Sequence, residues 1–394
     1  MDFSLSDEQR AWQFKARQFA EQEIRPISLQ RDVIPGARDT FDWEIIKKGS
    51  QLGFRTAALP RAWGGHGIDF VTQALVMAEL ARGDSAISKT FSQCWKFSQR
   101  MATNCTDDQK ARFLRAFVAD DCYLLGSAST EPNAGSDNRL PPADDPKAGW
   151  KLQAVRDGDE WILNGEKCFI ANGSVAKLFI VSSRTDPNVS IREGSTMFMV
   201  PVGTPGFRIG KVFNKRGWRF YQNAELIFEN ARVPHANVLG EVNGGSKTRG
   251  AGVGLDFSDF ELASNALGVC AAAVDLATQH ARSAQRGGGL RADQQTVQMK
   301  LAEMHMLTES LRSFVLRTAW EMDQKVRGSA NAQLVMLLSS ETIQRVTRLN
   351  MDIHGAAPGG VHPYAEKLAR DGMIWTHLAG ASVQRMKAAR HLLK

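Results

Sequence analysis

The stretch Ser129-Thr130-Glu131-Pro132-Asn133-Ala134-Gly135-Ser136-Asp137 decides how the rest of the chain is interpreted. Pro132, Asn133 and Gly135 bend the backbone, and the hydroxyl side chains and backbone N–H groups give the loop many polar contacts. Such a loop can hold the polar edge of a ring or a phosphate. The same residues also suit an ordinary connecting loop, so the flanking sequence has to separate the two interpretations.

A second informative stretch is Asn164-Gly165-Glu166-Lys167-Cys168-Phe169-Ile170-Ala171-Asn172-Gly173. Asn164-Gly165 separates the apolar run 161–163 from the run 167–170, which predicts a tight hairpin turn at this dipeptide. Further short apolar runs, divided by Gly, Pro, Asn and Asp, occur at 178–181, 197–200 and 225–228. Residues 121–239 are therefore predicted to form a compact, barrel-like β domain.

Helical periodicity lies on both sides of this β segment. Ser6 to Gln9 has the pattern of a capping box, and Trp12, Ala16 and Phe19 follow at helical spacing. After Gly244-Gly245 two apolar stripes return, which we interpret as the core of a helix bundle. The stripes comprise Leu262, Ala266, Val269, Ala273 and Leu276, then Val297, Leu301, Met304, Leu311 and Val315. The prediction is an α+β multi-domain chain with an N-terminal α-helical domain (1–120), a middle β domain (121–239) and a C-terminal four-helix bundle (240–394).

Composition excludes several classes of protein. With 394 residues, 43% of them apolar and 23% charged, the chain has the make-up of a globular protein with a large core. No apolar run approaches the about 20 residues that span a bilayer, and residues 1–4 carry no secretory pattern. The five scattered cysteines contain no CxxC pair, so we expect neither a zinc site nor disulfides, and a cytoplasmic location. The net charge of +7 lacks a basic run with interleaved aromatics, so we expect no nucleic-acid partner.

Four motifs in the same order resemble those of the acyl-CoA dehydrogenase family. The first quoted stretch is similar to the family's TEPGAGSD signature, and the second to its NG-K-WITNG strand. Residues 224–228 and 233–234 resemble the AEL-F and VP elements, and residues 363–371 resemble the helix before the catalytic segment. The α, β, α order also agrees, so the resemblance covers nearly the whole chain.

The resemblance implies an FAD-dependent enzyme that acts on acyl thioesters of coenzyme A, with an electron-transfer partner and a homotetrameric or homodimeric assembly. In the implied chemistry, a carboxylate removes the α-proton of the thioester while the β-hydride passes to flavin N5. Donors must polarise the thioester carbonyl, and the backbone N–H of Ala379 is expected to be one of them. The implied contacts to the flavin and the pantetheine arm are Ser127, Ser129, Thr130, Gly135 and Ser136, while Phe169, Ile170 and Ala171 are expected along the isoalloxazine ring.

The chain departs from the family at the catalytic base. Ala379 stands where the family's E-G-T segment has its glutamate, and Ala381 takes the last place of that segment, beside the flavin. Some members move the base to the first helix of the C-terminal bundle, at the position of Ser258 here. Asp259 follows it, where the family often has arginine, and burial beside a flavin would raise the pKa of such a carboxylate towards that of a useful base.

We therefore take Asp259 as the candidate base. The alternative is that Asp256 and Asp259 are acids favoured by the dipole at a helix N-terminus. Glu261 is a weaker candidate, because two further residues rotate it by roughly 200° around the helix.

Other departures concern the cofactor and the acyl group. The family's R-x-x-F-G motif, which reaches the FAD of a neighbouring subunit, becomes residues 284–288, so Arg282 or Arg286 is expected to replace its arginine. Gln295 matches the glutamine downstream, and Gly355 remains of the Q-x-x-GG-G motif. Ala171 replaces the threonine beside flavin N5.

The expected substrate contacts are Ser136, Asp256 and Trp95. Trp95 lies where the family builds its acyl pocket, although ordinary core packing explains it equally well. His354 and His362 flank a Gly/Pro-rich loop, but their spacing is unspecific, so we expect packing roles and no metal site.

Three functions stay open at this point. The leading hypothesis is FAD-dependent α,β-dehydrogenation of an acyl-CoA with a displaced base. The second keeps the fold and the flavin but makes the protein a flavin monooxygenase or an enoyl-thioester reductase. The third is a non-catalytic subunit that binds flavin or coenzyme A as a scaffold.

Overall fold

The computed structural model describes residues 4–138, 144–250, 256–286, 288–326, 329–357, 360–378 and 381–393. The chain begins with helices, and the first of them starts at the predicted capping box, in which Ser6 and Gln9 bond each other's backbone N–H groups. Trp12, Ala16 and Phe19 form its buried face. The helices of this part are α1 (Asp7–Phe19), the π-helical η1 (Ala20–Ile24), α2 (Arg25–Asp32), α3 (Trp43–Gln51), α4 (Phe70–Asn104), α5 (Asp107–Gln109), the π-helical η3 (Lys110–Leu114) and α6 (Arg115–Ala119).

The middle of the chain is a mixed β-sheet. Its strands are β1 (Leu124–Ala128), β2 (Gln153–Asp157), β3 (Glu160–Ala171), β4 (Ala176–Arg184), β5 (Ser195–Pro201), β6 (Phe207–Val212), β7 (Asn223–Pro234) and β8 (Val238–Leu239). Their order is β6-β7-β3-β2-β4-β5-β8, and β1 lies parallel to β4 beside this path. The apolar runs 178–181, 197–200 and 225–228 lie in β4, β5 and β7, as predicted.

The predicted hairpin turn at Asn164-Gly165 is wrong. Strand β3 continues through this dipeptide, where the register against β7 shifts and Gly165 adopts a φ of 134°. Asn164 bonds across the strands to Asn230, accepting from its backbone N–H at 2.8 Å, so the dipeptide forms a bulge. The turn lies earlier, at Gly158-Asp159, which connects β2 to β3 and in which Gly158 has a φ of 60°.

The last part of the chain is a helical bundle. Its elements are α7 (Gly245–Gly250), α8 (Asp256–Ser283), the short strands β9 (Gln285–Arg286) and β10 (Gly289–Leu290), α9 (Gln295–Asp323), α10 (Asn331–His354), β11 (Ala356–Ala357), β12 (Gly360–Val361), α11 (Pro363–Met373) and α12 (Ala381–Leu392). Segment Phe257–Ser283 of α8 is long and apolar enough to cross a membrane, but 83% of its most apolar window is buried inside the protein. We interpret α8 as the central helix of the bundle.

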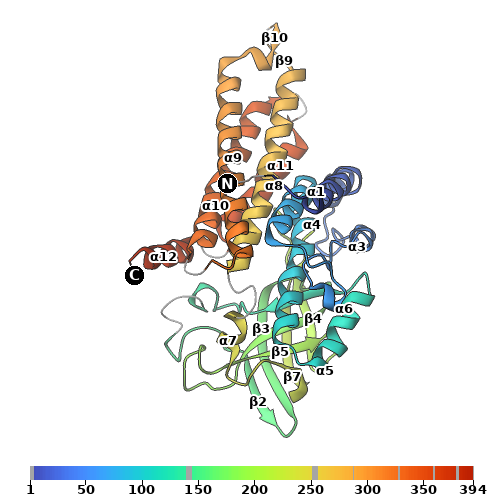
Figure 1. Ribbon diagram of the computed structural model, residues 1–394, viewed down its shortest axis with the longest axis vertical. Helices are drawn as coiled ribbons and strands as arrows, with labels where there is room; N and C mark the ends of the chain where they lie inside the picture. Colours follow the sequence, from blue (N-terminus) through green and yellow to red (C-terminus); the bar gives the residue numbers. More distant parts are fainter. Residues whose placement is uncertain are drawn as a thin grey trace.

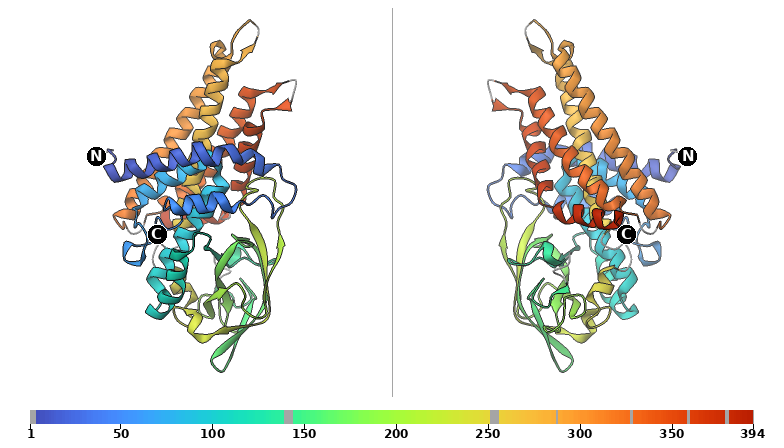
Figure 2. Two further views of the ribbon diagram at one scale, coloured as in Figure 1. Left: turned by 90° about the vertical axis from the view of Figure 1, so that its right-hand side faces the viewer. Right: turned by 90° about the vertical axis from the view of Figure 1, so that its left-hand side faces the viewer.

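The three parts are stacked along the long axis of the molecule. Figure 1 shows the bundle at one end and the β domain at the other, and Figure 2 shows the N-terminal helices lying across their junction. Helix α4 packs on α1, α8 and β1 and therefore touches all three parts. The fold class predicted from the sequence is confirmed.

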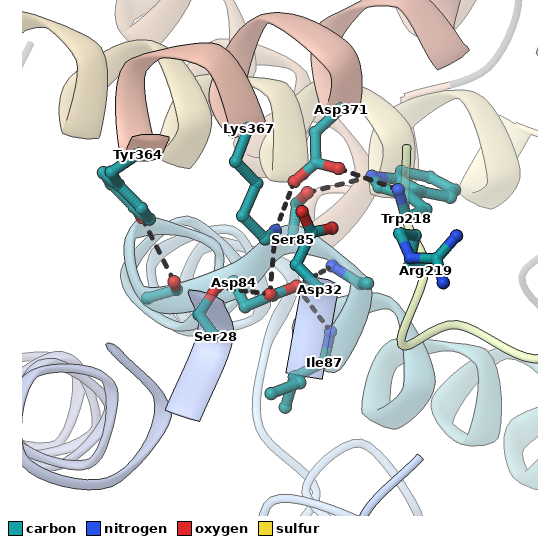
Figure 3. Close-up of polar contacts among 12 residues, drawn as sticks. Ser28, Asp32, Asp84, Ser85, Ile87, Trp218, Arg219, Tyr364, Lys367 and Asp371 are labelled. Atoms are coloured by element: carbon teal, nitrogen blue, oxygen red, sulfur yellow. Dashed lines mark hydrogen bonds and ion pairs between the residues drawn. The ribbon is translucent and has the colours of Figure 1, made fainter. Parts of the chain in front are cut away.

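A buried polar network joins the three parts at this junction (Figure 3). Lys367 Nζ of α11 lies 2.9 Å from an Asp84 carboxylate oxygen and 2.7 Å from one of Asp371. Asp371 accepts the backbone N–H of Trp218, in the loop before β7, at 2.7 Å. Asp84 breaks the helical backbone of α4 and accepts the N–H of Ala86 at 2.8 Å, so it also caps the second half of that helix.

Candidate active site

The turn-rich loop 129–137 and the strand segment 164–173 lie side by side. The backbone N–H of Cys168 donates to the carbonyl of Thr130 at 2.9 Å. Lys167 Nζ pairs with Glu131 at 2.8 Å, and both side chains are buried. Glu131 also accepts the backbone N–H groups of Lys151 and Leu152 at 2.6 and 2.9 Å. An ion pair and backbone hydrogen bonds therefore fix the turn-rich loop against the C-terminal half of β3.

An exposed aromatic ring stands beside this junction. Phe169 has a φ of 55°, an uncommon value for a residue with a side chain, and its ring is 58% exposed. It stacks on Phe213 with ring centroids 4.2 Å apart. Strain of this kind persists where the surrounding structure holds it and often accompanies function. The flat apolar face next to Ala171 is a suitable wall for a planar ring.

Polar groups of the turn-rich loop border the same region. Ser129 Oγ lies 3.1 Å from Ser182 Oγ, and Ser127 and Thr130 are partly buried beside it. Ser136 is exposed, and a side chain at Gly135 would meet no atom within 4 Å. An aromatic wall next to hydroxyls and an open loop matches what FAD requires, namely an apolar face for its ring and donors for its polar arm.

Helix α4 forms the next wall of this region. Asn172 Nδ2, at the end of β3, donates to the carbonyls of Thr90 in α4 and Leu125 in β1, at 3.4 and 3.1 Å. The backbone N–H of Leu125 reaches Cys94 Sγ at 3.5 Å. The middle of α4 is thereby fixed against the strands that carry both quoted stretches.

The carboxylates near the start of α8 point in different directions. Asp259 is buried, and its Oδ1 accepts Gln384 Nε2 of α12 at 2.8 Å. Glu261 is fully buried against α4, where its Oε1 lies 2.5 Å from Lys89 Nζ and accepts Ser92 Oγ at 2.6 Å. Ser258 shares the α4 side of the helix, since Lys96 Nζ reaches its Oγ at 3.4 Å.

Burial and the two lysines act oppositely on Glu261. Burial alone would raise the pKa of this carboxyl group, but Lys89 and Lys96 together lower it below its ordinary value. Burial lowers the pKa of Lys89 in spite of its carboxylate partner. Glu261 is therefore held ionised by two ammonium groups, which makes it a weak proton acceptor.

The remaining predicted site residues either lie away from this region or fall outside the residues that the structure describes. Trp95 is fully buried and donates its indole N–H to the Phe54 carbonyl at 2.6 Å, so its ring belongs to the N-terminal core. Ala379 lies outside the described residues. The side chains of Asp256, Arg286 and Ala381 are likewise not described, although their backbones lie in α8, β9 and α12.

A third group lies at the far end of the bundle. Arg282 lies in the last turn of α8 and is exposed, Gln295 begins α9, and Gly355 follows α10 with a φ of 63°. The ends of α8 and α10 meet there, because His280 and His354 stack with centroids 4.3 Å apart. Figure 1 shows this end, marked by β9 and β10, on the opposite side of the bundle from the β domain.

Sequence reasoning missed a row of polar residues on α4, of which Lys89 and Lys96 meet Glu261 of α8. Lys89, Gln93, Lys96 and Arg100 recur at spacings of four, three and four residues, which places them on one face of the helix. That spacing was visible in the sequence. Its significance comes from burial in an otherwise apolar interface, which the pattern alone does not give.

Sequence models of three acyl-CoA dehydrogenase domains match nearly the whole chain. The N-terminal domain model covers residues 6–121, the middle domain model 126–231 and the C-terminal domain model 251–393. The chain belongs to the acyl-CoA dehydrogenase family. The members of this family are FAD-dependent oxidoreductases, and the site described above fits that cofactor.

Individual relatives agree with this assignment over their full length. The chain is 31% identical to the probable acyl-CoA dehydrogenase YngJ of Bacillus subtilis, with all of both chains covered. It is also 31% identical to the acryloyl-CoA reductase (NADH) of Anaerotignum propionicum, over all of this chain and 96% of that one. The structure of butyryl-CoA dehydrogenase from Megasphaera elsdenii superposes with a TM-score of 0.91 at 30% identity, covering all of both chains.

Proposed function

We propose that the protein catalyses α,β-dehydrogenation of an acyl-CoA thioester, with Asp259 as the displaced base. The observation that carries this proposal is the contact between Asp259 and Gln384. Gln384 lies in the first turn of α12, directly after the segment that carries the base in other members of the family. Asp259 is thus a buried carboxylate in contact with α12.

Glu261 is less suited to this role. Its pKa is lowered by two lysines, so its affinity for a proton is reduced. Asp259 accepts a hydrogen bond from the Gln384 amide, which ties its carboxylate to α12. A carboxylate whose pKa is lowered accepts the proton of a weakly acidic C–H group less readily.

The chain's own groups would remove the α-proton and polarise the thioester carbonyl. Asp259 takes the α-proton of the thioester, and the backbone N–H of Ala379 donates to the thioester carbonyl as negative charge develops on it. FAD, when bound, supplies the acceptor for the hydride. The Glu131–Lys167 pair keeps the loop of Ser129 and Thr130 in place, and the wall formed by α4 excludes water.

We also propose a homodimer or homotetramer in the cytoplasm, reoxidised by an electron-transfer partner. Arg282, Gln295 and Gly355 lie at helix ends of the bundle, whereas Ser127 and Phe169 lie in β1 and β3. Figure 1 shows β9 and β10, which connect α8 to α9, at the opposite end of the molecule from the β domain. One chain therefore presents two separate groups of cofactor-binding residues. A second copy would bring one group against the other.

The test is exchange of the α-proton in deuterated water, followed by mass spectrometry of the acyl-CoA. Asp259→Asn is expected to reduce the exchange rate by about 100-fold or more, because general bases contribute factors of this size. The FAD content and melting temperature should remain close to those of the unmodified protein. Asp275→Asn is the matched control, since Asp275 lies on the same helix and pairs with Arg82 at the surface. Exchange at the full rate in Asp259→Asn would rule out this base.

The acryloyl-CoA reductase relative supports a second candidate function, reduction of an enoyl thioester by the same site. The absence of a hydroxyl at Ala171 agrees with altered chemistry beside the ring. Anaerobic bleaching of the yellow protein by a saturated acyl-CoA supports dehydrogenation. Consumption of NADH only when an enoyl-CoA is present, with no bleaching by saturated thioesters, would support reduction instead.

A further inference from the structure

Three polar side chains from α8 and the loop before β7 are buried without a complete set of hydrogen bonds. They are those of Tyr221, Glu261 and Asn265, which are 3%, 0% and 0% exposed. The Tyr221 hydroxyl, Glu261 Oε2 and Asn265 Oδ1 each lack a hydrogen-bond partner in the part of the chain that the structure describes. Buried polar atoms usually have partners, so three exceptions need a physical reason. We call these three residues the polar triad.

Aromatic packing brings the members of the triad together. Tyr221 packs edge-on against Trp218, with ring centroids 5.6 Å apart, and Trp218 packs in the same way against Trp375, at 4.8 Å. The Trp375 indole N–H donates to the carbonyl of Leu262, the residue after Glu261, at 3.2 Å. Burial, and after it the negative charge of nearby Glu261, raise the pKa of Tyr221. Its hydroxyl therefore keeps its proton and can donate it in a hydrogen bond.

The other two members of the triad are acceptors. Asn265 Nδ2 donates to the Glu261 backbone carbonyl at 2.8 Å, which fixes the amide and leaves Oδ1 as the unpaired atom. In the Glu261 carboxylate, Oε1 is the oxygen that Lys89 and Ser92 contact, whereas Oε2 accepts no hydrogen bond. The triad thus offers two acceptor oxygens and one hydroxyl. A group that completes it must therefore donate a hydrogen bond of its own.

This requirement narrows the chemical class of the missing group. A carboxylate or a carbonyl only accepts hydrogen bonds, so it would leave Glu261 and Asn265 unpaired, and Glu261 would repel a carboxylate. An ammonium group would be repelled by Lys89, whose Nζ lies 2.5 Å from the Glu261 carboxylate. A methyl group would leave all three members unpaired. A hydroxyl group accepts from Tyr221, donates to an acceptor and carries no charge.

The triad lies within reach of the proposed base. Ser92 of α4, which donates to Glu261, lies between two residues that fix α4 against β1 and the end of β3. Along α8, Glu261 and Asn265 are two and six residues beyond Asp259, so the middle of this pair is about 6 Å further along the helix axis. An acyl chain whose α-carbon meets Asp259 would need only a few further atoms to reach the triad.

A packing role does not account for a tyrosine at this position. Tyr364, which is 4% exposed, shows the usual arrangement, because its hydroxyl donates to the carbonyls of Arg82 and Gly83 at 3.0 and 3.2 Å. Tyr221 is as deeply buried, yet its hydroxyl makes no such bond. Phenylalanine would fill the same space without the cost of burying an unpaired hydroxyl.

We propose that the polar triad is the specificity site for the acyl group and that the substrate is a short acyl-CoA with a hydroxyl group at the far end of its chain. The inference rests on the proposed function, because it assumes that an acyl thioester occupies this site. It adds the chemical class of the substrate. The substrate hydroxyl accepts from Tyr221 and donates to the acceptor oxygens of Glu261 and Asn265.

The test compares matched thioesters on the FAD-loaded protein by anaerobic isothermal titration calorimetry. At chain lengths of four, five and six carbons, the acyl-CoA with a terminal hydroxyl is compared with two analogues. One carries fluorine in place of the hydroxyl and cannot donate, and the other carries a methyl group there. At the best length the hydroxyl compound should bind at least tenfold more tightly than both analogues. Absence of this preference at all three lengths would overturn the proposal and leave water as the partner of the triad.

A variant then assigns the preference to the triad. Tyr221→Phe should reduce the ratio of the hydroxyl and methyl affinities by tenfold or more, chiefly by weakening the hydroxyl compound. The melting temperature without thioester should not fall, because the Tyr221 hydroxyl has no bond to lose. Tyr364→Phe is the matched control, which loses two hydrogen bonds and should melt at a lower temperature with the ratio unchanged. An unchanged ratio in Tyr221→Phe, or an equal loss for both thioesters, would contradict the role of Tyr221.

The two proposals fail in different ways. Absence of α-proton exchange with every thioester would refute the proposed dehydrogenation. The preference for a hydroxyl group is a ratio of binding constants and is measured whether or not the α-proton exchanges. A protein that exchanges the α-proton of the methyl compounds and binds the hydroxyl compounds no more tightly would keep the function and refute the specificity site.

Discussion

Two residues far apart in sequence, Glu131 and Lys167, hold the loop and the strand of the candidate site together. Their side chains form an ion pair that is almost completely buried. Removing one partner from such a pair leaves a charge that neither water nor a counter-ion stabilises. The two backbone N–H groups on Glu131 would reduce that cost without removing it.

We expect Lys167→Met to lower the free energy of unfolding by about 3 kcal/mol. Urea denaturation followed by circular dichroism measures this change. Lys177→Met is the control, because Lys177 pairs with Asp120 at the surface and should cost under about 1 kcal/mol. The double variant with Glu131→Gln should cost less than the sum of its single variants, and strict additivity would show that the pair is not coupled.

Single residues also show where sequence reasoning reached its limit. Asn164-Gly165 and Gly158-Asp159 are both typical of tight turns. Only pairing with β7 decides that the first is a bulge, because Asn164 bonds to Asn230, 66 positions away. In the same way, Glu261 meets Lys89 across 172 positions, so neither residue's pattern indicates the ion pair.

Helix α10 ends in a cluster of histidines that should make the protein sensitive to acid. His354 is buried, stacks on His280, and lies 4.8 Å from His362 between ring centroids. Burial lowers the pKa of His354 to about 4, with a bond to the Asn350 carbonyl opposing the shift and His280, His362 and Arg291 adding to it. The folded protein therefore keeps His354 neutral at a pH where the unfolded chain, with an ordinary value of 6.5, already binds a proton.

The sign of the effect follows from proton binding. Between pH 6.5 and pH 4 the unfolded chain binds more protons at this residue, so stability falls as the pH falls. His354→Phe keeps the ring but cannot be protonated. Its melting temperature should drop less than that of the unmodified protein between pH 7 and pH 5. His305→Phe, at an exposed position on α9, is the control, and an identical drop in all three proteins would contradict the prediction.

At the scale of elements, amphipathic patterns predicted much of the fold. The stripes in α8 and α9 and the runs in β4, β5 and β7 lie where their periods placed them. The break in α4 at Asp84 was not predicted, because residues 71–82 continue a regular helical pattern up to it. The break depends on Lys367 and Ser28, which meet the Asp84 carboxylate only in the folded chain.

In the whole molecule, the network around Lys367 explains how three parts of the chain can share one site. Asp84 belongs to the N-terminal helices, Trp218 to the β domain, and Lys367 and Asp371 to the bundle (Figure 3). The sequence predicted the order of these parts, because each has its own period. It did not predict the network, which requires side chains from three separate segments. The network fixes α4 and α11, and with them the walls on which the proposed chemistry depends.

The two groups of residues that are expected to contact FAD give the last prediction. Phe169 lies in β3 of the β domain, and Arg282 lies in the last turn of α8, next to β9. Figure 1 shows β9 at the opposite end of the molecule from the β domain. If both contact FAD, each site must combine Phe169 of one copy with Arg282 of another. Phe169→Ala and Arg282→Ala should each lose FAD when purified alone. In a symmetric dimer, a mixed pair has one site with both changes and one site with neither.

Co-expression of the two variants with different affinity tags therefore tests the arrangement. Random pairing should restore FAD to about a quarter of all sites, and pairs isolated through both tags should bind FAD at about half of theirs. The yellow absorbance of the purified protein, relative to its concentration, measures this fraction. Combining both changes in one chain supplies the control, because its dimers contain no intact site, only doubly altered ones. Failure of the mixed pairs to regain FAD would place both residues in the same site of one chain, or Arg282 outside the site altogether.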